Sequence, residues 1–348
     1  MVFDTPKPMV KVCVNGYGVI GKRCVSAILK QNDMKLVGIS DVSADWRIKM
    51  AVRKGIPIYA AIPERVEEMK KAGVEVAGSL EDLLKQVDVV IDCTPAKVGA
   101  RNKELYVKLG VKGIFQGGEK HEVAGTSFVA QCNYEESLGK AFTRVVSCNT
   151  TALCRVLGAI HKRYGVRKVR VVIVRRAVDV WESGRTGIMN TVVPEIGVSH
   201  HAPDVKTVIH DLDIVSMAAK GAHNLFHLHF AILEPKVKLS KDEVITALRE
   251  EPRIALVRGA DGVDGLHSIF EIGRDTERPR GDIYEIPVWE DGVMVIGEEV
   301  YLMWATPNES NVVPENVDAV RALTETTLDW RESVAQTDEA LGITKNLY

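Results

Sequence analysis

VKVCVNGYGVIG, residues 10–21, joins a run of β-branched residues to a segment with glycines at positions 16, 18 and 21. This G-x-G-x-x-G spacing is typical of the turn between the first strand and the first helix of a dinucleotide-binding fold. The first glycine permits a tight turn, the second lets the backbone approach a pyrophosphate, and the third lets the helix pack closely on the strand. The segment therefore predicts a strand, a turn and a helix, with Gly16, Gly18 and Gly21 at a dinucleotide site.

KLVGISD, residues 35–41, predicts a second strand that ends on an acidic residue. Asp41 comes 20 residues after Gly21, where a carboxylate accepts hydrogen bonds from the ribose hydroxyls of NAD. A carboxylate also repels the 2′-phosphate of NADP, so NAD is the expected preference, with NADP as the alternative. Four nearby basic residues either neutralise that phosphate or form a solvated helix face: Arg47, Lys49, Arg53 and Lys54.

Strand-like and helix-like segments alternate from residue 10 to the region of Cys148, which predicts a parallel, doubly wound sheet. Later runs such as KVRVVIVRRAVDV and NLFHLHFAILEPKV are typical of a largely antiparallel sheet. We expect an α/β protein with an N-terminal doubly wound Rossmann domain over residues 1–148 and an α/β catalytic domain over residues 149–314. A helix from about 315 to 348 is expected to join the first domain. Clefts between domains commonly hold ligands, so a site near Cys148 is expected.

Charge and composition argue against several classes of protein. The net charge of −2, from 45 basic and 47 acidic residues, gives no footprint for nucleic acid or an anionic membrane. No apolar run approaches the roughly 18 residues of a membrane span, and the N-terminus lacks the pattern of a signal peptide. The six cysteines have irregular spacings without CxxC pairs, which argues against a disulfide framework and a zinc site. A cytoplasmic protein with reduced thiols and no metal is expected.

RVVSCNTTAL, residues 144–153, places Cys148 between a predicted strand and a predicted helix. A helix N-terminus favours the thiolate, which predicts a reactive cysteine, and an ordinary buried thiol is the alternative. A thiolate and a dinucleotide together suggest oxidation of an aldehyde through a thioester.

Such chemistry needs a base and anion sites, and spacing alone does not select the base. In FHLHFAIL, His227 and His229 share one face of a predicted strand, so either or both can point into the cleft. The other candidate histidines are His161, His200, His201, His210, His223 and His267. Arg175 and Arg176 are expected on opposite faces of a strand, and the SHH segment at 199–201 offers donors for a phosphate.

The motifs NGYGVIGKR, IFQGGEKHEVA, RVVSCNTTALCR, VRRA, SHHAPDV, HLH and VVPENVDAVRA occur in this order. Together they closely resemble the archaeal type of phosphorylating glyceraldehyde-3-phosphate dehydrogenase, from about residue 9 to 344. The resemblance implies a cytoplasmic homotetramer whose catalytic-domain sheet carries the subunit contacts. It also implies the reaction of glyceraldehyde 3-phosphate, inorganic phosphate and NAD(P)⁺ to 1,3-bisphosphoglycerate.

The resemblance assigns roles to individual residues. Cys148 is the implied nucleophile, and His227, the first histidine of L-x-H-x-H, takes the thiol proton and assists hydride departure. The backbone N–H groups of Ser147 and Asn149 are expected to stabilise the oxyanion. From the glycine motif, the end of the second strand and the resemblance together, the expected cofactor contacts are Gly16, Gly18, Val19, Ile20, Gly21, Asp41, Thr94, Pro95, Gly118, Arg176 and Asn308. The implied substrate and phosphate contacts are Ser147, Asn149, Thr150, Arg175, His200 and His201.

The sequence departs from the family pattern at three places. Many archaeal members have lysine and threonine after the second strand, where this chain has Asp41 and Val42. Residues 221–224 read GAHN instead of a segment with Pro-Thr-Thr, and residues 307–310 read PNES instead of HQES. The alternatives are a dehydrogenase of another phosphorylated or acidic aldehyde, such as erythrose 4-phosphate or aspartate semialdehyde, and a non-catalytic nucleotide-binding scaffold.

Overall fold

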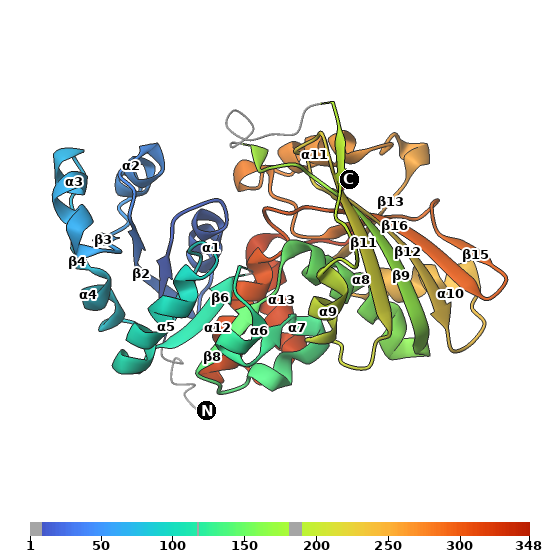
Figure 1. Ribbon diagram of the computed structural model, residues 1–348, viewed down its shortest axis with the longest axis horizontal. Coiled ribbons are helices and arrows are strands. Elements are labelled where there is room, and N and C mark those ends of the chain that lie inside the picture. Colours follow the sequence, from blue (N-terminus) through green and yellow to red (C-terminus); the bar gives the residue numbers. More distant parts are fainter. Residues whose placement is uncertain (1–8, 117, 181–189) are drawn as a thin grey trace, which may run out of the picture. The chain divides into compact units, whose positions relative to one another are not determined.

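The computed structural model describes residues 9–116, 118–180 and 190–348 in two compact units (Figure 1). The first unit comprises the chain up to Ala130, together with Tyr134–Val145 and Val313–Leu341. The second comprises Gln131–Asn133, Val146–Val312 and Gly342–Tyr348. The short helix α7 (Ala130–Asn133) contributes residues to both.

A parallel sheet of eight strands forms the centre of the first unit, in the order β4-β3-β2-β1-β5-β6-β8-β7. The order reverses between β1 and β5, which is the arrangement of a doubly wound nucleotide-binding sheet. The strands are β1 (Val10–Asn15), β2 (Met34–Asp41), β3 (Ile58–Ala60), β4 (Gly78–Ser79), β5 (Val89–Asp92), β6 (Lys112–Gln116), β7 (Ser127–Phe128) and β8 (Phe142–Val145).

Side chains cap the starts of two helices of this unit, Asp45 at α2 and Ser79 at α4. Ser79 and Asp82 form a reciprocal capping box at the start of α4. The helices are α1 (Gly21–Ile28), α2 (Trp46–Arg53), α3 (Val66–Lys71), α4 (Leu80–Leu84), α5 (Val98–Leu109), α6 (His121–Ala124), α12 (Val313–Thr324) and α13 (Trp330–Leu341).

A buried arginine ties the C-terminal helices into the first unit. Arg321 of α12 donates to both carboxylate oxygens of Asp33, at 2.7 and 2.9 Å, and to Gln31 at 2.8 Å. The Arg321 side chain is 2% exposed and that of Asp33 is 28% exposed, so these charge-assisted bonds anchor a buried guanidinium group to a partly exposed carboxylate. Helix α12 also packs on α1, β6 and β8.

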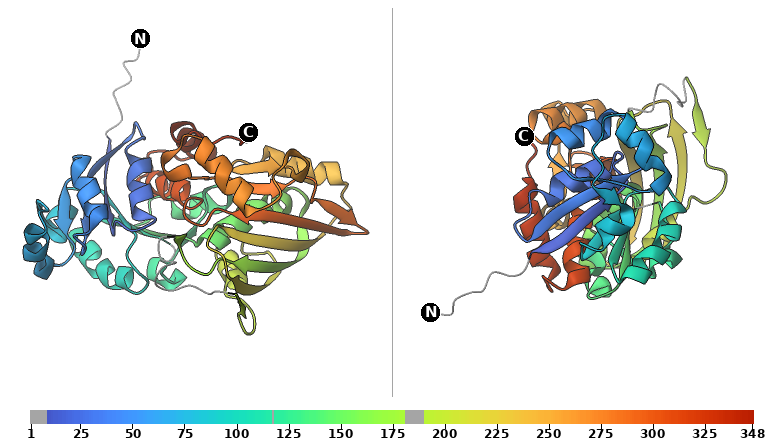
Figure 2. Two further views of the ribbon diagram at one scale, coloured as in Figure 1. Left: turned by 90° about the horizontal axis from the view of Figure 1, so that it is seen from above. Right: turned by 90° about the vertical axis from the view of Figure 1, so that its left-hand side faces the viewer.

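A mixed sheet forms the second unit, in the order β10-β11-β9-β12-β16-β14-β13, with β15 on β16. Antiparallel pairs predominate, and β9/β11 and β13/β14 are parallel. The long strands β9, β12 and β16 run side by side in Figure 2. The strands are β9 (Val166–Arg175), β10 (Val192–Pro194), β11 (Ile214–Gly221), β12 (His227–Pro235), β13 (Ile254–Val257), β14 (Ile286–Trp289), β15 (Met294–Ile296) and β16 (Glu299–Thr306). The predicted α/β class with a largely antiparallel second sheet is confirmed.

Helix α8 (Cys148–Tyr164) packs against β12, β14 and β16 and fixes which face of the second sheet is covered. Along β12, His227 and His229 are buried, whereas Leu228 is partly exposed and Phe230 is exposed. The other helices of this unit are α9 (His201–Lys206), α10 (Lys241–Glu250) and α11 (Leu266–Asp275). The two histidines therefore share the face that α8 covers. In the described ranges, no helix is long and apolar enough to cross a bilayer.

Two loop glycines are required by sterics. Gly16 has φ +91°, and a Cβ there would lie 2.9 Å from the carbonyl carbon of Cys93. A Cβ on Gly21 would lie 1.9 Å from the carbonyl oxygen of Gly16, whereas nothing lies within 4 Å of one on Gly18. The first turn of α1 can therefore lie this close to the loop only with glycine at position 21.

The substitution Gly21→Ala should lower the free energy of unfolding by about 2 kcal/mol or more, because loop or helix must shift to admit the methyl group. Gly18→Ala is the matched control and should change it by less than about 0.5 kcal/mol. Urea unfolding of the two variants measures both values. Equal losses for the two variants would contradict this packing.

Candidate active site

The glycine loop and β2 form a cradle in the first unit. Asp41, the last residue of β2, accepts hydrogen bonds from the N–H of Tyr17 at 2.7 Å and the N–H of Ser43 at 2.8 Å, one on each carboxylate oxygen. Each oxygen keeps acceptor capacity for a ribose hydroxyl. Gly18 opens on free space, as close approach of a pyrophosphate requires, and the half-buried Val19 and Ile20 follow it before α1. The cradle therefore fits a dinucleotide.

The basic residues near Asp41 are engaged elsewhere or solvated. Arg47 of α2 pairs with Asp45 at 2.6 Å, and Asp45 also caps that helix through the Arg47 N–H. Lys49, Arg53 and Lys54 are exposed, as expected for a solvated helix face. This arrangement leaves Asp41 as the charged group held against the glycine loop.

The other predicted cofactor residues of the first unit come together at the ends of β5 and β6. Thr94 donates from its N–H to Asp92 at 2.9 Å, and Pro95 follows it. A Cβ on Gly118 would lie 3.3 Å from the N atom of Ala96, and one on Gly16 3.1 Å from the N atom of Thr94. Gly16, Thr94, Pro95 and Gly118 thus line one region at the strand ends of this sheet.

In the second unit, Cys148 is the first residue of α8, and its neighbours build the start of that helix. The Ser147 hydroxyl accepts from the Thr150 N–H at 3.3 Å, and the Thr150 hydroxyl donates to Asp204 at 2.8 Å. Asn311 donates to the carbonyl oxygen of Cys148 at 2.9 Å. The side chains of Ser147 and Thr150, predicted as substrate contacts, are thus committed to the helix start, which fixes the backbone around the sulfur.

His227, at the start of β12, lies beside this sulfur. Its Nε2 is 3.6 Å from the Cys148 Sγ, and its Nδ1 accepts the backbone N–H of Arg176 at 3.0 Å. A ring nitrogen that accepts an N–H carries no proton, so the neutral imidazole holds its proton on Nε2. The geometry therefore revises the predicted role of His227: Nε2 is a donor toward sulfur and not a vacant base for the thiol proton.

Burial and two arginines shift the pKa values of Cys148 and His227. Burial raises the pKa of the Cys148 thiol, while Arg176, the Asn149 N–H and Arg175 act to lower it. Burial also lowers the pKa of His227 well below its usual value, and the same two arginines lower it further. The prediction that the helix N-terminus makes Cys148 an acidic thiol is therefore wrong, because removal from water outweighs the favourable groups.

Arg175 ends β9 and Arg176 follows it, and they have different partners. Arg175 pairs with Glu195, and its Nε has no hydrogen-bond partner among the described residues. Arg176 pairs with Asp179. The side-chain amide of Asn308 lies between Arg176 and Asp179. When the amide oxygen faces Arg176, it accepts a hydrogen bond from the Nε of Arg176 at 2.6 Å. The predicted contacts Arg176 and Asn308 are thus brought together in the second unit.

Three histidines gather around Asn149, the residue that follows Cys148. His200 precedes α9 and His201 begins it, and their ring centroids are 4.0 Å apart. Burial lowers the pKa of His201 to about 3, with contributions from His200 and Arg175. Asn149 contacts His201 through its amide nitrogen at 3.3 Å and His229 through its amide oxygen at 2.8 Å. The structure thus brings together Asn149, His201 and the second histidine of the HLH segment.

Several neighbours of the site were not predicted. Asp179, Asp204 and Asn311 orient Arg176, Thr150 and Cys148, respectively. Asp204 lies within the SHHAPDV motif, but the motif gave no indication of its role. The divergent 221–224 segment lies beside the arginines, since the N–H of Ala177 donates to the carbonyl oxygen of His223 at 2.8 Å. Among the described residues, no group of three or more His, Cys, Asp or Glu side chains is arranged to hold a metal ion.

Comparisons with known proteins place both units in a wider context. The model for the glyceraldehyde 3-phosphate dehydrogenase C-terminal domain matches residues 147–292, and that for the dihydrodipicolinate reductase N-terminus matches residues 10–118. The chain is 46% identical to the glyceraldehyde-3-phosphate dehydrogenase of Methanothermus fervidus, over 96% of this chain and 99% of that protein. It is 47% identical to the proteins of the same name from Methanopyrus kandleri, over 96% and 97%, and Metallosphaera sedula, over 97% and 99%.

Alkylation of Cys148 measures its pKa directly. The rate of carbamidomethylation at Cys148, followed by peptide mass spectrometry, should have its inflection at a higher pH than an unperturbed thiol. Arg176→Ala removes a cation that favours the thiolate but keeps the backbone N–H to His227, so the inflection should move higher still. Arg167→Ala, on an exposed arginine of β9, is the control and should leave it in place. An inflection below that of an ordinary thiol would refute this electrostatic account.

Proposed function

The chain belongs to the glyceraldehyde-3-phosphate dehydrogenase family and is an NAD(P)-dependent oxidoreductase that acts on an aldehyde, and we propose that it catalyses phosphorylating oxidation of D-glyceraldehyde 3-phosphate to 1,3-bisphosphoglycerate. The observation that carries this proposal is the Cys148 sulfur at the start of α8, 3.6 Å from Nε2 of His227. The reaction is placed in the cytoplasm, where this thiol stays reduced.

The thiolate of Cys148 attacks the aldehyde carbon, a C–S bond forms, and the carbonyl oxygen becomes an oxyanion. Two donors beside the sulfur support this step, the Nε2–H of His227 and the N–H of Asn149. Such donors stabilise the thiolate first and the oxyanion next. Because burial raises the pKa of Cys148, the thiol must first lose its proton, which is released to solvent, and the thiolate that forms is the attacking species. His227 acts as a hydrogen-bond donor to that thiolate.

A nicotinamide cofactor, when held by the residues of the glycine loop and Asp41, would supply the acceptor for the hydride. The carbon–hydrogen bond breaks, the hydride leaves with its electron pair, and the oxyanion becomes the carbonyl of a thioester on Cys148. An oxygen of inorganic phosphate then bonds to the acyl carbon as the C–S bond breaks. The thiolate of Cys148 is restored, and the acyl phosphate leaves.

Two anionic groups must be held during this sequence, one on the aldehyde and one as inorganic phosphate. Arg175 and Arg176 bring guanidinium groups to the neighbourhood of Cys148, and both act on its pKa. His200 and His201 add ring N–H donors beside Asn149. Arginine and histidine at fixed positions are suited to phosphate oxygens. We assign the two phosphate subsites to these four residues.

The proposed cofactor contacts are those of the cradle in the first unit, with NAD preferred over NADP. Asp41 supports this preference because its carboxylate is fixed against the glycine loop, where a 2′-phosphate meets like charge. The preference rests on the charge at position 41, which a substitution can reverse.

One plate assay tests the reaction. We expect reduction of the cofactor with glyceraldehyde 3-phosphate only when inorganic phosphate is added, and faster with NAD⁺ than with NADP⁺. Cys148→Ser should lower kcat by at least about a thousandfold and leave cofactor binding intact, because an alcohol is a far weaker nucleophile than a thiolate. Asp41→Lys should shift the ratio of rates toward NADP⁺.

The same assay separates the competing accounts. Activity without added phosphate would show that water cleaves the thioester, so that the product is a free acid and not an acyl phosphate. If the enzyme did not oxidise glyceraldehyde 3-phosphate but did oxidise erythrose 4-phosphate or aspartate semialdehyde, the substrate would be that other aldehyde. Substantial activity in Cys148→Ser would remove the thioester.

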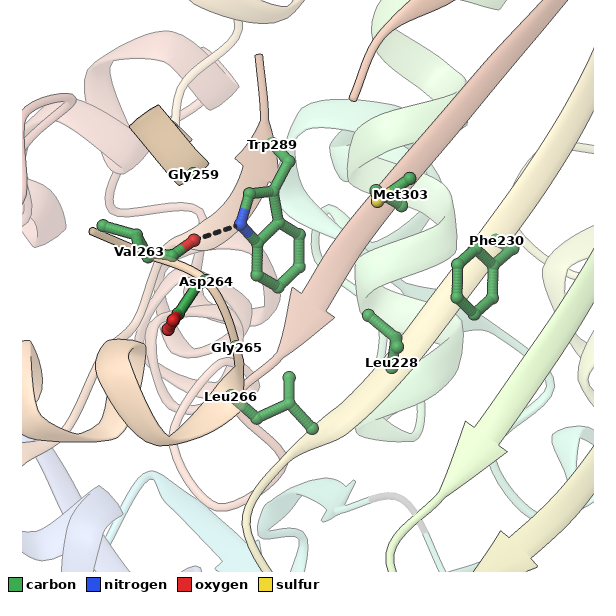
Figure 3. Close-up of a pocket in the computed structure, with 9 residues that line it drawn as sticks. All are labelled: Leu228, Phe230, Gly259, Val263, Asp264, Gly265, Leu266, Trp289 and Met303. Atoms are coloured by element: carbon green, nitrogen blue, oxygen red, sulfur yellow. Dashed lines mark hydrogen bonds between the residues drawn. The ribbon is translucent and has the colours of Figure 1, made fainter. Parts of the chain in front are cut away.

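An exposed apolar row on the second sheet supports a homotetramer. Met217, Val172, Phe230 and Met303 are paired in register across β11, β9, β12 and β16, on the face opposite His227 and His229. Met217 is 59% exposed and Phe230 38%. The row ends at a cavity of about 290 Å³, where Figure 3 shows Phe230, Leu228 and Met303 across from Trp289. We propose that further copies of this chain cover this face.

Light scattering should give a native mass of four 38.3 kDa chains. Phe230→Asp should lower that mass, because a carboxylate in an apolar interface is desolvated without a partner. Val107→Asp, at an exposed apolar residue of α5, is the control and should leave it unchanged. A monomeric native protein would refute the assembly.

A further inference from the structure

A chain of three buried polar side chains runs behind Cys148 from β12 to α9. The Nε2 of His229 lies 2.8 Å from the Oδ1 of Asn149, and the Nδ2 of Asn149 lies 3.3 Å from the Nε2 of His201. The exposed fractions of these residues are 0%, 3% and 1%. Nothing in the reaction proposed above uses His229, although it is as deeply buried as any side chain in the site.

An amide has one end that accepts and one that donates, so the two histidines must differ in protonation at Nε2. With the amide as placed, His229 donates from Nε2–H to Oδ1, and Nδ2–H of Asn149 donates to the Nε2 of His201. That nitrogen then carries no proton, and neutral His201 holds its proton on Nδ1. The orientation of the Asn149 amide thereby couples the tautomer of His201 to that of His229.

The opposite direction is disfavoured by what surrounds His229. Its ring packs edge-on against Trp304 at 5.2 Å between centroids, and its Nδ1 has no partner among the described residues. Reversal would place a proton on that nitrogen, leaving a buried donor without an acceptor among the described residues. A buried donor without a partner is rarer in proteins than an acceptor without one. In the direction from His229 to His201, the unpaired acceptor is Nδ1 of His229 in the core, and the unpaired donor is Nδ1–H of His201, which the phosphate proposed above would accept.

We propose that His229 is a positioning residue that, through Asn149, holds His201 as the Nδ1–H tautomer and so presents an N–H donor to the substrate phosphate. Both the assignment of the phosphate and the choice of the tautomer rest on the function proposed above. The Nδ1 of His201 and the Nε of Arg175 both lack partners among the described residues, so each has a hydrogen bond left to make.

The electrostatics of the cluster agree with a neutral ring. Burial, His200 and Arg175 lower the pKa of His201 to about 3, and Glu195 alone opposes them. His201 thus remains uncharged at neutral pH and binds an anion through a directed N–H and not through charge. The positive charge at this place comes from Arg175.

Long-range ¹H–¹⁵N correlations of the intact protein, labelled at histidine, read the tautomer directly. His201 is assigned by loss of its signals in His201→Gln. We expect a protonated Nδ1 and a bare Nε2, and a shift of the Nδ1–H signal on addition of inorganic phosphate. A protonated Nε2 on His201 in the wild-type protein would overturn the inference without reference to any variant.

Variants at position 229 test the transmission. His229→Leu removes the donor to Asn149, so the His201 signals should become those of a tautomer mixture, and KM for the aldehyde phosphate should rise about tenfold with less change in kcat. His229→Gln places an amide nitrogen near the position of Nε2 and should restore the tautomer and most of KM. His161→Leu removes a histidine at the far end of α8 and is the control. An unchanged His201 tautomer in His229→Leu would overturn the proposal.

The two proposals fail in different ways. An enzyme inactive on glyceraldehyde 3-phosphate whose His201 Nδ1–H still shifts with inorganic phosphate would overturn the reaction and support the relay. An active enzyme with a protonated Nε2 on His201 would support the reaction and overturn the relay.

Discussion

The contact between the Cys148 sulfur and Nε2 of His227 depends on the meeting of two segments almost 80 residues apart. The sulfur is placed by the first turn of α8, and the imidazole by the first residue of β12. The backbone N–H of Arg176, where the neighbouring strand β9 ends, fixes the ring from its other side. The pairing of β9 with β12 therefore sets the position of the ring and also the atom that carries its proton.

The site works by holding neutral rings among paired charges. Burial keeps His227, His229 and His201 uncharged at neutral pH, because a charged ring there would lose its hydration. The cations are supplied by two arginines, each held by a carboxylate, Arg175 by Glu195 and Arg176 by Asp179. The guanidinium groups thus supply the positive charge that attracts anions and favours the thiolate. The neutral histidines contribute N–H donors whose orientation is fixed.

The sequence predicted the elements whose physics is local. The glycine spacing after β1 predicted a turn that the structure explains by the φ of Gly16 and the crowding at Gly21. Alternation along the second half of the chain predicted a largely antiparallel sheet and the shared face of His227 and His229. Resemblance to a family selected His227, which spacing alone did not do.

What the sequence did not predict depends on contacts between distant segments. The helix N-terminus at Cys148 suggested an acidic thiol, but desolvation of the folded site, which no short motif reports, has the larger effect. The hydrogen bond from Arg176 to His227 requires the register of β9 on β12. The Asn149 amide joins residues more than 50 positions away on either side of the site. Each of these features appears only when the strands and helices are assembled.

The central claim is that His227 meets the sulfur as a donor, and the ¹⁵N shifts of its two ring nitrogens test this most directly. The account predicts a protonated Nε2 and a bare Nδ1 at neutral pH, with Nδ1 still bare after Cys148 is converted to serine. A protonated Nδ1, or an imidazolium with both nitrogens protonated, would contradict it and would return His227 to the role of a base.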